Sequence, residues 1–375
     1  MELKNKVLHI ITSTDGGGAE NMLLKYLTNT DKSKFSHIVV SLKRKGPIAK
    51  KIEMLGIKVF DLKFSKFKFY KLLNLLRISK NFRPEIIQTW LYHSDFLGLF
   101  VKIFQPSAKL IWSVRSNDVC KYKNSTCLLR KFLSYFSTFP DVIIFNSKRS
   151  ISHHTDLGYK PKKIEFIPNG FDTSRFTPLL NETNYLKSKF NLNQEMILGM
   201  VARFSPEKDY ETFFEACKLI LEKNKNIRFF VVGKNINVRN SEIQNILNKL
   251  LIKESVHLLD ESNEIENIIR CFDVMCLTSI DEAFPNVIGE AMSSGVPCVA
   301  TNVGDTKILL KKGGIVVEPK NPSALAKACL MLLSISDKER QTIGDFSRKR
   351  IIDYYSVEKV SEKFDNLYQE LLIEN

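Results

Sequence analysis

The chain has 375 residues, of which 44% are hydrophobic and 26% charged, and this composition excludes a predominantly disordered protein. At roughly 150 residues per domain, the length predicts roughly two domains. No uninterrupted apolar run reaches the roughly 18 residues that a transmembrane helix needs, so we expect no such helix. Lys and Arg (56) outnumber Asp and Glu (41), and the net charge of +15 favours anionic partners: nucleic acid, an anionic membrane or phosphorylated substrates.

The start of the chain and its cysteines indicate a cellular compartment. The first six residues lead directly into the apolar run 7–11, which is too short for the hydrophobic region of a secretory signal peptide. The seven cysteines form no Cys-x-x-Cys pair, and their odd number is a poor basis for a disulfide framework. We therefore expect a cytoplasmic protein whose thiols are reduced and mostly buried.

Short apolar runs alternate with longer helix-like stretches, the pattern of an α/β protein with parallel sheets. The first series of predicted strands comprises residues 7–12, 37–41, 58–60, 86–89, 110–114, 142–146 and 164–168. The second series comprises residues 196–202, 227–232, 256–259, 274–278, 298–301 and 315–317. A polar, turn-rich stretch separates the two series. We therefore predict one domain over residues 1–180, a second over 181–355, and a C-terminal helix within 356–375 that could pack back on the first domain.

A glycine-rich turn follows the first predicted strand. Residues 15–20 read Asp-Gly-Gly-Gly-Ala-Glu and precede an apparent helix. Gly17 and Gly18 let the backbone approach a ligand closely, and the helix N-terminus favours an anion. The spacing is not Gly-x-Gly-x-x-Gly, because position 21 is Asn, so a dinucleotide-binding dehydrogenase is disfavoured. A tight turn without a ligand is the alternative for this segment.

A basic loop follows the first strand of the second series. Arg203 and Lys208 lie in this loop, at the carboxyl end of the strand, where α/β proteins bind ligands. A planar guanidinium and an ammonium point charge suit a diphosphate, whose negative charge must be neutralised as it leaves. A solvated loop without a ligand is the simpler interpretation of this segment taken alone.

Two carboxylates flank a predicted helix start in the second domain. Pro285 marks a helix that begins near residue 286, with Glu282 in the loop before it and Glu290 about one turn into it. Carboxylates accept hydrogen bonds from sugar hydroxyls, and the amides and dipole of a helix N-terminus stabilise phosphate. Two glutamates at this spacing are weak evidence for a site by themselves. The predicted loop, helix and strand around them strengthen that evidence.

Together these segments resemble the family 4 retaining glycosyltransferases of the GT-B fold. The resemblance extends over nearly the whole chain. It rests on four motifs in order: Gly-Gly-Gly-Ala-Glu at 16–20, Ile-Pro-Asn-Gly-Phe-Asp at 167–172, Arg203 with Lys208, and Glu282 with Glu290. Residues 88–93 and 111–116 are similar to those of bacterial enzymes that build surface polysaccharide, such as lipopolysaccharide or capsule, or lipid-linked glycans.

This resemblance implies two Rossmann-like domains that face each other across a cleft, with a nucleotide-sugar held mainly by the second domain. Arg203 and Lys208 would bind the donor diphosphate. Glu290 would bind the ribose hydroxyls, and Glu282 the hydroxyls of the donor sugar. The backbone at the start of the predicted helix would cradle phosphate and sugar, and its positions are Phe284, Pro285, Asn286 and Val287.

The resemblance also assigns residues of the first domain. Gly17 and Gly18 would bring its backbone against the donor, and His93 would lie at the sugar or the acceptor. A hydrogen-bonded structural histidine is the alternative for His93. The catalytic set implied in this way is Glu282, Arg203, Lys208 and His93.

The implied chemistry needs no metal ion. Arg203, Lys208 and a helix N-terminus can stabilise the leaving diphosphate, and the chain contains no Asp-x-Asp pair that would chelate a metal. We therefore expect no metal site and no cofactor besides the nucleotide-sugar substrate, with uridine the expected base. The family also implies retention without a covalent intermediate, in which the departing phosphate oxygen takes the acceptor proton on the same face.

A basic run between Leu62 and Pro84 contains seven Lys and Arg residues and no acidic residue, with Phe and Tyr interleaved. This composition suits an interfacial contact with an anionic membrane, such as the inner leaflet, where a polyprenyl-linked acceptor would lie. The alternative is a core helix whose lysines are solvated. A second basic stretch, 121–130, could border the same acceptor.

The function expected from these observations is transfer of a sugar from a nucleotide-sugar to a lipid-linked or surface polysaccharide acceptor. The enzyme would lie on the cytoplasmic face of the inner membrane. A nucleotide-sugar epimerase of the same fold is one alternative. A non-catalytic protein that binds nucleic acid or glycan is another, although no nucleic-acid module is recognisable in the sequence.

Overall fold

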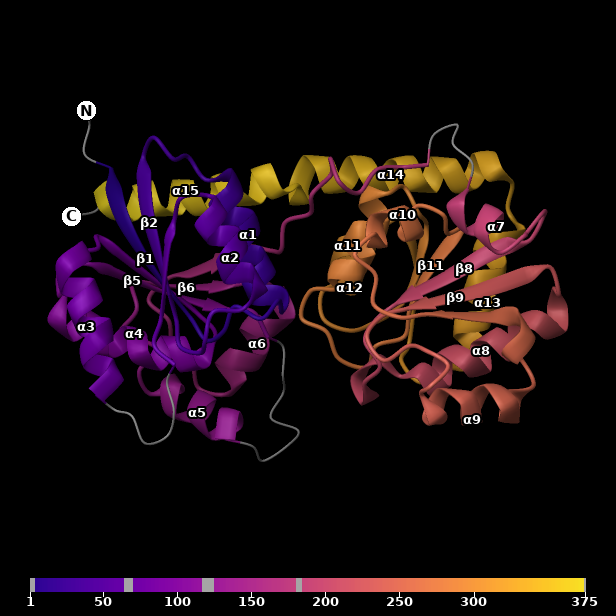
Figure 1. Ribbon diagram of the computed structural model, residues 1–375, viewed down its shortest axis with the longest axis horizontal. Helices are drawn as coiled ribbons and strands as arrows, with labels where there is room; N and C mark the ends of the chain where they lie inside the picture. Colours follow the sequence, from indigo (N-terminus) through magenta and orange to yellow (C-terminus); the bar gives the residue numbers. More distant parts are fainter. Residues whose placement is uncertain (1–3, 64–69, 117–124, 180–183, 374–375) are drawn as a thin grey trace. The chain divides into compact units, whose positions relative to one another are not determined.

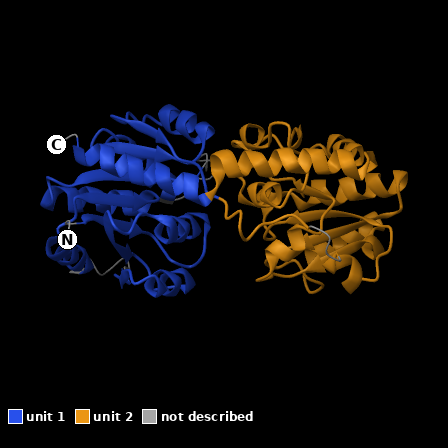
Figure 2. Cartoon of the chain, turned by 90° about the horizontal axis from the view of Figure 1, so that it is seen from above, with its two compact units in different colours: residues 1–170, 357–375 blue, residues 171–356 orange. Residues whose placement is uncertain are grey.

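The computed structural model describes residues 4–63, 70–116, 125–179 and 184–373 (Figure 1). The chain divides into two compact units (Figure 2). Unit 1 contains Met1–Gly170 and Val357–Asn375, and unit 2 contains Phe171–Ser356. Each unit is built around its own parallel sheet, which confirms the predicted α/β class.

The sheet of unit 1 has the strand order β3-β2-β1-β4-β5-β6-β7, with every pair parallel. Its strands are β1 (Asn5–Ile11), β2 (Phe35–Ser41), β3 (Lys58–Asp61), β4 (Ile86–Trp90), β5 (Lys109–Val114), β6 (Val142–Phe145) and β7 (Ile164–Phe166). The central strands are almost wholly buried, because helices cover both faces of the sheet. The seven strands predicted for the first half of the chain are thereby confirmed.

Alternate side chains of these strands supply two cores. Val7 and Ile11 point to one face, where α1 (Gly18–Asn29), α2 (Pro47–Met54) and α15 (Val357–Ile373) pack. Leu8 and Ile10 point to the other face. That face is covered by α3 (Tyr70–Phe82), α4 (Tyr92–Phe104), α5 (Ser125–Ser134) and α6 (Lys148–Asp156), and the two helical layers are visible in Figure 1. The period of two thus distributes each strand between the two cores.

Unit 2 repeats this plan with the strand order β10-β9-β8-β11-β12-β13. Its strands are β8 (Met196–Val201), β9 (Ile227–Val232), β10 (Val256–Leu259), β11 (Val274–Leu277), β12 (Cys298–Thr301) and β13 (Gly314–Val317). One face carries α8 (Tyr210–Lys223), α9 (Ser241–Leu250) and α13 (Pro322–Ser334). The other carries α7 (Tyr185–Lys189), α10 (Ile265–Ile269), α11 (Asn286–Ser293), α12 (Thr306–Leu310) and α14 (Asp337–Tyr355).

The chain passes from unit 1 to unit 2 at Gly170 and Phe171, so the predicted boundary after residue 180 is too late. Phe171 and Phe176 are buried in the core of unit 2. A Cβ at Gly289 would lie 2.0 Å from the Phe171 ring, so the ring packs directly on the α11 backbone. The polar composition after Pro168 suggested a linker. The segment instead belongs to the second domain, because Phe171 and Phe176 bury apolar surface in its core.

The C-terminal helix α15 belongs to unit 1, where Phe364 and Tyr368 are buried beside α1 and the sheet. Asp365 anchors the helix by accepting hydrogen bonds from Tyr26 Oη (2.8 Å) and Thr30 Oγ1 (2.8 Å). The last helix of the chain therefore completes a core that the first strands began.

The basic run at 62–84 supplies α3. Leu75 is fully buried, and other apolar side chains of α3 pack against the same core: Leu72, Leu76, Ile78 and Phe82. The helix therefore serves the core, as the structural alternative predicted. Phe64, Phe67 and Phe69 lie outside the described residues, as does most of the second basic stretch, so the expected membrane contact there stays a prediction.

Five cysteines are buried free thiols, as expected: Cys217, Cys271, Cys276, Cys298 and Cys329. Cys127, however, is disulfide-bonded, so the expectation of reduced thiols throughout is wrong at this position. The absence of a Cys-x-x-Cys pair does not prevent bonds between cysteines at other spacings. Within the described ranges, no helix combines the length and the apolar character needed to cross a membrane.

Candidate functional site

Two loops meet at the centre of the unit 2 sheet. Strands β8 and β11 are neighbours, and successive crossovers lead away from them in opposite directions along the sheet. Open α/β sheets bind ligands outside the carboxyl ends of the strands at such a switch point. Arg203 and Lys208 follow β8, and Glu282 follows β11, so the topology brings these predicted residues to one edge.

Lys208 and Glu282 form an ion pair at this edge. Lys208 Nζ lies 2.5 Å from Glu282 Oε1, and both side chains are only 16% exposed. Ser279 Oγ donates a second hydrogen bond to the same carboxylate oxygen, at 2.8 Å. Among the described residues, Glu282 Oε2 has no hydrogen-bond partner. The pair thus retains an acceptor oxygen and further ammonium protons for a ligand.

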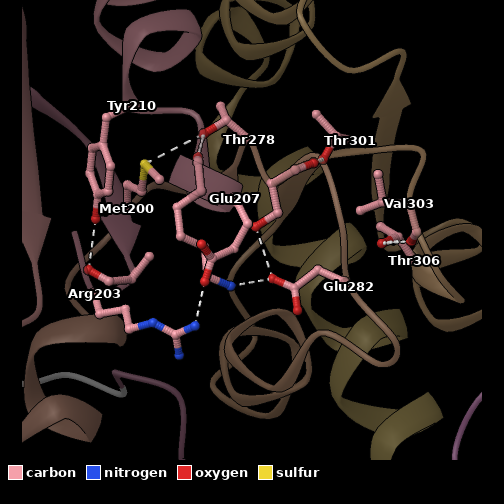
Figure 3. A network of polar contacts seen from close by, with 12 residues as sticks. Met200, Arg203, Glu207, Tyr210, Thr278, Glu282, Thr301, Val303 and Thr306 are labelled. Carbon is pink, nitrogen blue, oxygen red and sulfur yellow. Dashed lines mark hydrogen bonds and ion pairs between the residues drawn. The ribbon is translucent and has the colours of Figure 1, made fainter. Parts of the chain in front are cut away.

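The two loops are held in register by hydrogen bonds from hydroxyl side chains (Figure 3). Thr278 Oγ1 donates to the carbonyl of Lys208 at 2.7 Å, and Thr301 Oγ1 donates to the carbonyl of Ser279 at 2.5 Å. Neither threonine is among the residues predicted from the sequence. Their signal in the sequence is a hydroxyl residue at or just beyond the carboxyl end of β11 and of β12.

Gly304 supports the Glu282 loop from the opposite side. Its φ of +51° is left-handed, and a Cβ at this position would lie 2.1 Å from the carbonyl oxygen of Glu282. The amide of Asp305 donates to the carbonyl of Ala283 at 3.1 Å. The turn after β12 therefore fits the backbone of the Glu282 loop closely, and glycine is required for the fit.

Arg203 lies in the predicted loop after β8, where an acidic neighbour contacts it. Its guanidinium pairs with Glu207 of the same loop, and the Arg203 side chain is 64% exposed (Figure 3). Glu207 was not selected from the sequence, although its position four residues after Arg203 suits such a pair. The bond engages only part of the five-donor guanidinium, so the loop presents a cation at the edge of the site.

The helix α11 begins at Asn286, as predicted, with Pro285 as its N-cap residue. Phe284 is buried, with its ring 6.1 Å from Phe171 and 5.7 Å from Tyr355, so its side chain belongs to the core. Pro285 has no amide proton, which leaves the first N–H groups of α11 as the donors of this segment.

Glu290 lies in the second turn of α11 and is half-buried. Its charge acts on Arg175, whose pKa is raised first by a hydrogen bond from Arg175 to Glu266 and also by the negative charge of Glu290. The carboxylate of Glu290 therefore stands in a different electrostatic environment from that of Glu282. The two glutamates of the motif therefore interact with different cations, Glu282 with Lys208 and Glu290 with Arg175.

In unit 1, the glycine-rich turn and His93 lie at the carboxyl edge of the sheet. Gly17 is the N-cap residue of α1, and Gly18 is its first residue. His93 lies in the first turn of α4, which follows β4, the neighbour of β1. Thr12 Oγ1 and Ser94 Oγ, 3.3 Å apart, join the loops after these two strands. The structure therefore brings the first-domain candidates to one edge.

The local environment of each first-domain candidate is specific. Ser13 Oγ donates to Glu20 Oε1 at 2.5 Å, and a Cβ at Gly17 would lie 2.6 Å from the other oxygen of Glu20. The His93 side chain is accessible to solvent, but neighbouring atoms shield part of its ring from water. This partial desolvation, together with the charge of Lys43, lowers the pKa of His93. His93 is therefore neutral at pH 7 and can both donate and accept a hydrogen bond.

Among the residues that the structure describes, no three His, Cys, Asp or Glu side chains gather as metal ligands would. The candidate site consists of cations, carboxylates and helix amides. Such a donor set suits a ligand that carries both phosphate and hydroxyl groups.

Two family models match the chain in succession. Glycosyltransferase Family 4 matches residues 16–175, and Glycosyl transferases group 1 matches residues 182–350. The first match covers the glycine-rich turn and His93, and the second covers Arg203, Lys208 and both glutamates. The two matches thus correspond to the two compact units.

Two curated relatives align over most of the chain. The UDP-Gal:alpha-D-GlcNAc-diphosphoundecaprenol alpha-1,3-galactosyltransferase of Escherichia coli is 26% identical over 314 residues, which cover 80% of this chain and 79% of the relative. The capsular polysaccharide biosynthesis glycosyltransferase CapM of Staphylococcus aureus is 23% identical over 319 residues, which cover 83% of each chain.

Solved structures share the fold. HepE of Anabaena, in complex with UDP and glucose, has a TM-score of 0.83 at 18% identity, over 98% of this chain and 100% of that chain. A glycosyltransferase of Rickettsia africae has a TM-score of 0.84 at 20% identity, over 98% of this chain and 99% of that chain. This likeness confirms the predicted GT-B fold of two Rossmann-like domains.

Proposed function

Because the chain belongs to the glycosyltransferases of family 4 and group 1, we propose that it transfers a sugar from a UDP-sugar to a lipid-linked glycan acceptor, with retention of configuration. The observation that carries this proposal is the Lys208–Glu282 pair at the switch point of the unit 2 sheet. A cation and a carboxylate 2.5 Å apart offer adjacent contacts for the phosphate and the hydroxyl groups of one donor.

The donor is assigned from the relatives and from the site. The name of the Escherichia coli relative specifies UDP-Gal, and HepE has been crystallised with UDP and with UDP-glucose. In this chain, Lys208 and Arg203 would neutralise the diphosphate, and the amides at the start of α11 would bind its oxygens. Glu290 would hold the ribose, and Glu282 the hydroxyls of the sugar.

The proposed chemistry begins with departure of the diphosphate. Lys208 and the α11 N-terminus stabilise the charge that develops on the leaving oxygen. That oxygen takes the proton of the acceptor hydroxyl on the same face of the sugar, so the anomeric configuration is retained. Two cationic side chains and a helix N-terminus supply this stabilisation from the protein, so we propose that the transfer is independent of a metal ion.

The acceptor is assigned to unit 1, where neutral His93 and the N-terminus of α1 lie at one sheet edge. The relatives act, by their names, on a diphosphoundecaprenol-linked sugar and in capsular polysaccharide biosynthesis. A polyprenyl-linked acceptor would place the enzyme at the cytoplasmic face of the inner membrane. His93 would then hydrogen-bond the acceptor hydroxyl or the sugar being transferred.

Titration calorimetry of UDP, GDP and ADP in the presence of EDTA tests the donor site. We expect wild type to bind UDP selectively and Lys208→Ala to lose about tenfold or more in affinity, because a charge-assisted contact to phosphate is removed. Lys218→Ala, which removes an exposed lysine from α8, is the control and should bind as wild type does. Equal affinities of the two variants, or no binding of UDP by wild type, would contradict the proposed site.

A further inference from the structure

An exposed apolar surface on unit 1 has no role in the site described above. Its side chains lie on α4, on α5 and in the turn after α5, and we call them the aromatic ridge: Ile103, Phe104, Leu128, Phe132, Tyr135 and Phe139. Leu128 and Tyr135 are each 74% exposed. Large apolar side chains that gather at one place on a surface mark a contact with a partner or a membrane.

Half-buried aromatic rings that also pack on the core join α4 and α5 at the base of the ridge. The Phe96 ring lies 5.1 Å from the Phe100 ring on α4 and 6.0 Å from the Phe132 ring on α5. The Phe136 ring continues the chain of contacts, at 5.0 Å from Phe132 and 5.8 Å from Phe139. These contacts connect Phe132 and Phe139 of the ridge with the neighbouring helix α4.

These side chains are not needed by the core. The inner faces of the same helices already supply buried residues to it, including Leu97 and Val101 of α4 and Leu133 of α5. The residues of the ridge lie on the outer faces. Burial against unit 1 therefore does not explain them.

The charges around the ridge are mostly positive. Helix α5 contains no acidic residue, and its Lys131 is exposed. Lys80 and Arg83, both exposed, line a surface pocket together with Gln105, the residue after α4, and with one acidic residue, Glu85. A second acidic residue, Asp141, is paired with Lys102 at 3.5 Å.

We propose that the aromatic ridge docks on an anionic lipid bilayer, with Leu128 and Tyr135 entering the interfacial region. Apolar and aromatic side chains flanked by lysine and arginine bind such surfaces by burial and by attraction to anionic lipids. This inference rests on the proposed function, since a lipid-linked acceptor requires the enzyme at a membrane. The proposed membrane contact lies on α4 and α5, and not on the 62–84 run that the sequence suggested.

The ridge and the acceptor edge share helix α4. His93 lies in the first turn of α4 and Phe104 is its last residue, so the two lie about 16 Å apart along the helix axis. Phe104 lies at the end of α4 that leads back to the amino edge of the sheet, so a bilayer bound there would keep unit 1 at the membrane, with the carboxyl edge about one helix length away. Docking would thus raise the local concentration of acceptor at the enzyme.

Vesicle flotation tests the proposal with the full chain. Vesicles of phosphatidylcholine with phosphatidylglycerol should bind wild type, and pure phosphatidylcholine should bind it more weakly. The double variant Leu128→Ser, Tyr135→Ser should lose about tenfold or more in partitioning, because two exposed apolar side chains no longer reach the bilayer. The control Val238→Ser, Leu251→Ser changes residues of unit 2 that are at least as exposed and should bind as wild type does.

Each outcome of these experiments supports or contradicts the proposed docking. Absence of wild-type binding to anionic vesicles, or equal loss in the two double variants, would overturn the ridge. A wild-type dimer that the ridge variant disrupts would also overturn it and assign the surface to a second copy. UDP calorimetry separates the two proposals. A wild type that binds both UDP and vesicles, with a ridge variant that binds UDP but not vesicles, supports docking. A wild type that does not bind UDP contradicts the proposed function itself.

The fold of the variants can be checked internally. Trp90 and Trp112 are fully buried in the unit 1 sheet, and neither is a residue of the exposed ridge. Their fluorescence should be unchanged in the ridge variant and should shift only if unit 1 unfolds. A red-shifted spectrum in the variant would assign its loss of binding to misfolding. Lys131→Glu, a charge change at an exposed site, would then decide the proposal by its weaker binding to anionic vesicles.

Discussion

Lys208 Nζ and Glu282 Oε1 lie 2.5 Å apart although 74 residues separate them in the chain. The pair forms because β8 and β11 are neighbours, so the loops that follow them meet. It lies partly shielded from water and is also bound by Ser279, which fixes the carboxylate in one orientation. The donor site that we propose is therefore organised before any ligand arrives.

The two glutamates should be separable by kinetics. We expect Glu282→Ala to lower turnover more than nucleotide affinity, because its contacts are with the sugar. Glu290→Ala should weaken UDP binding itself, because its contact is with the ribose. Calorimetry with UDP and steady-state kinetics measure the two effects. Equal losses of UDP affinity in the two variants, with unchanged turnover in both, would show that the roles are assigned wrongly.

Glu207 should compete with the donor for Arg203. In Glu207→Gln the guanidinium loses its charged partner, so we expect UDP affinity to rise by about two- to fivefold at low salt. Glu211→Gln, an exposed change in the first turn of α8, is the matched control for net charge. The same gain in both variants would mean that long-range charge, and not release of Arg203, is responsible.

Gly304 should be required for the geometry of the Glu282 loop. In Gly304→Ala the new Cβ would clash with the carbonyl of Glu282, so we expect turnover to fall by about tenfold or more while the protein still folds. Gly56→Ala also has a positive φ, +80°, but its Cβ would meet open space. The control should therefore lose some thermal stability and keep its turnover. Normal turnover in Gly304→Ala would remove this glycine from the site.

The stability of the protein should depend on pH through buried histidines. Burial lowers the pKa of His37 to about 3 and that of His154 to about 4, and burial with the charge of His37 holds the pKa of His9 well below 6.5. These groups therefore stabilise the fold fully above pH 6.5, and that contribution is lost as the pH falls below it. Asp95 acts in the opposite sense, because burial raises its pKa to about 7. Its contribution decreases as the pH rises from about 4 to 7.

The contribution of these four groups to the slope of stability against pH follows from their pKa values. Between pH 5 and 6 the unfolded chain binds roughly two more protons than the native state, three on histidines less one on Asp95. The free energy of unfolding should therefore rise by about 2 to 3 kcal/mol per pH unit. In Asp95→Asn the slope should increase to about 4 kcal/mol per pH unit. Urea unfolding at several pH values measures both slopes, and a flat profile in wild type would contradict the buried neutral histidines.

The amino-acid sequence by itself determined the fold class and the chemical types at the site. Buried strands made of Val, Ile and Phe, separated by amphipathic helices, predict parallel sheets because only helix-covered strands are apolar on both faces. The start of α11 followed from Pro285, since proline is typical of helix starts; the structure places it at the N-cap, one residue before the first turn. Lys208 and Glu282 were likewise recognisable, because each follows a predicted strand.

The tertiary structure alone decided which groups meet. Local sequence does not contain the strand order, so it could not show that Glu282 pairs with Lys208. The domain boundary was misplaced for the same reason, because the core that buries Phe171 is assembled from residues far along the chain. The aromatic ridge also emerges only when α4 and α5 pack side by side. Contacts of long sequence range depend on topology, which the whole chain determines cooperatively.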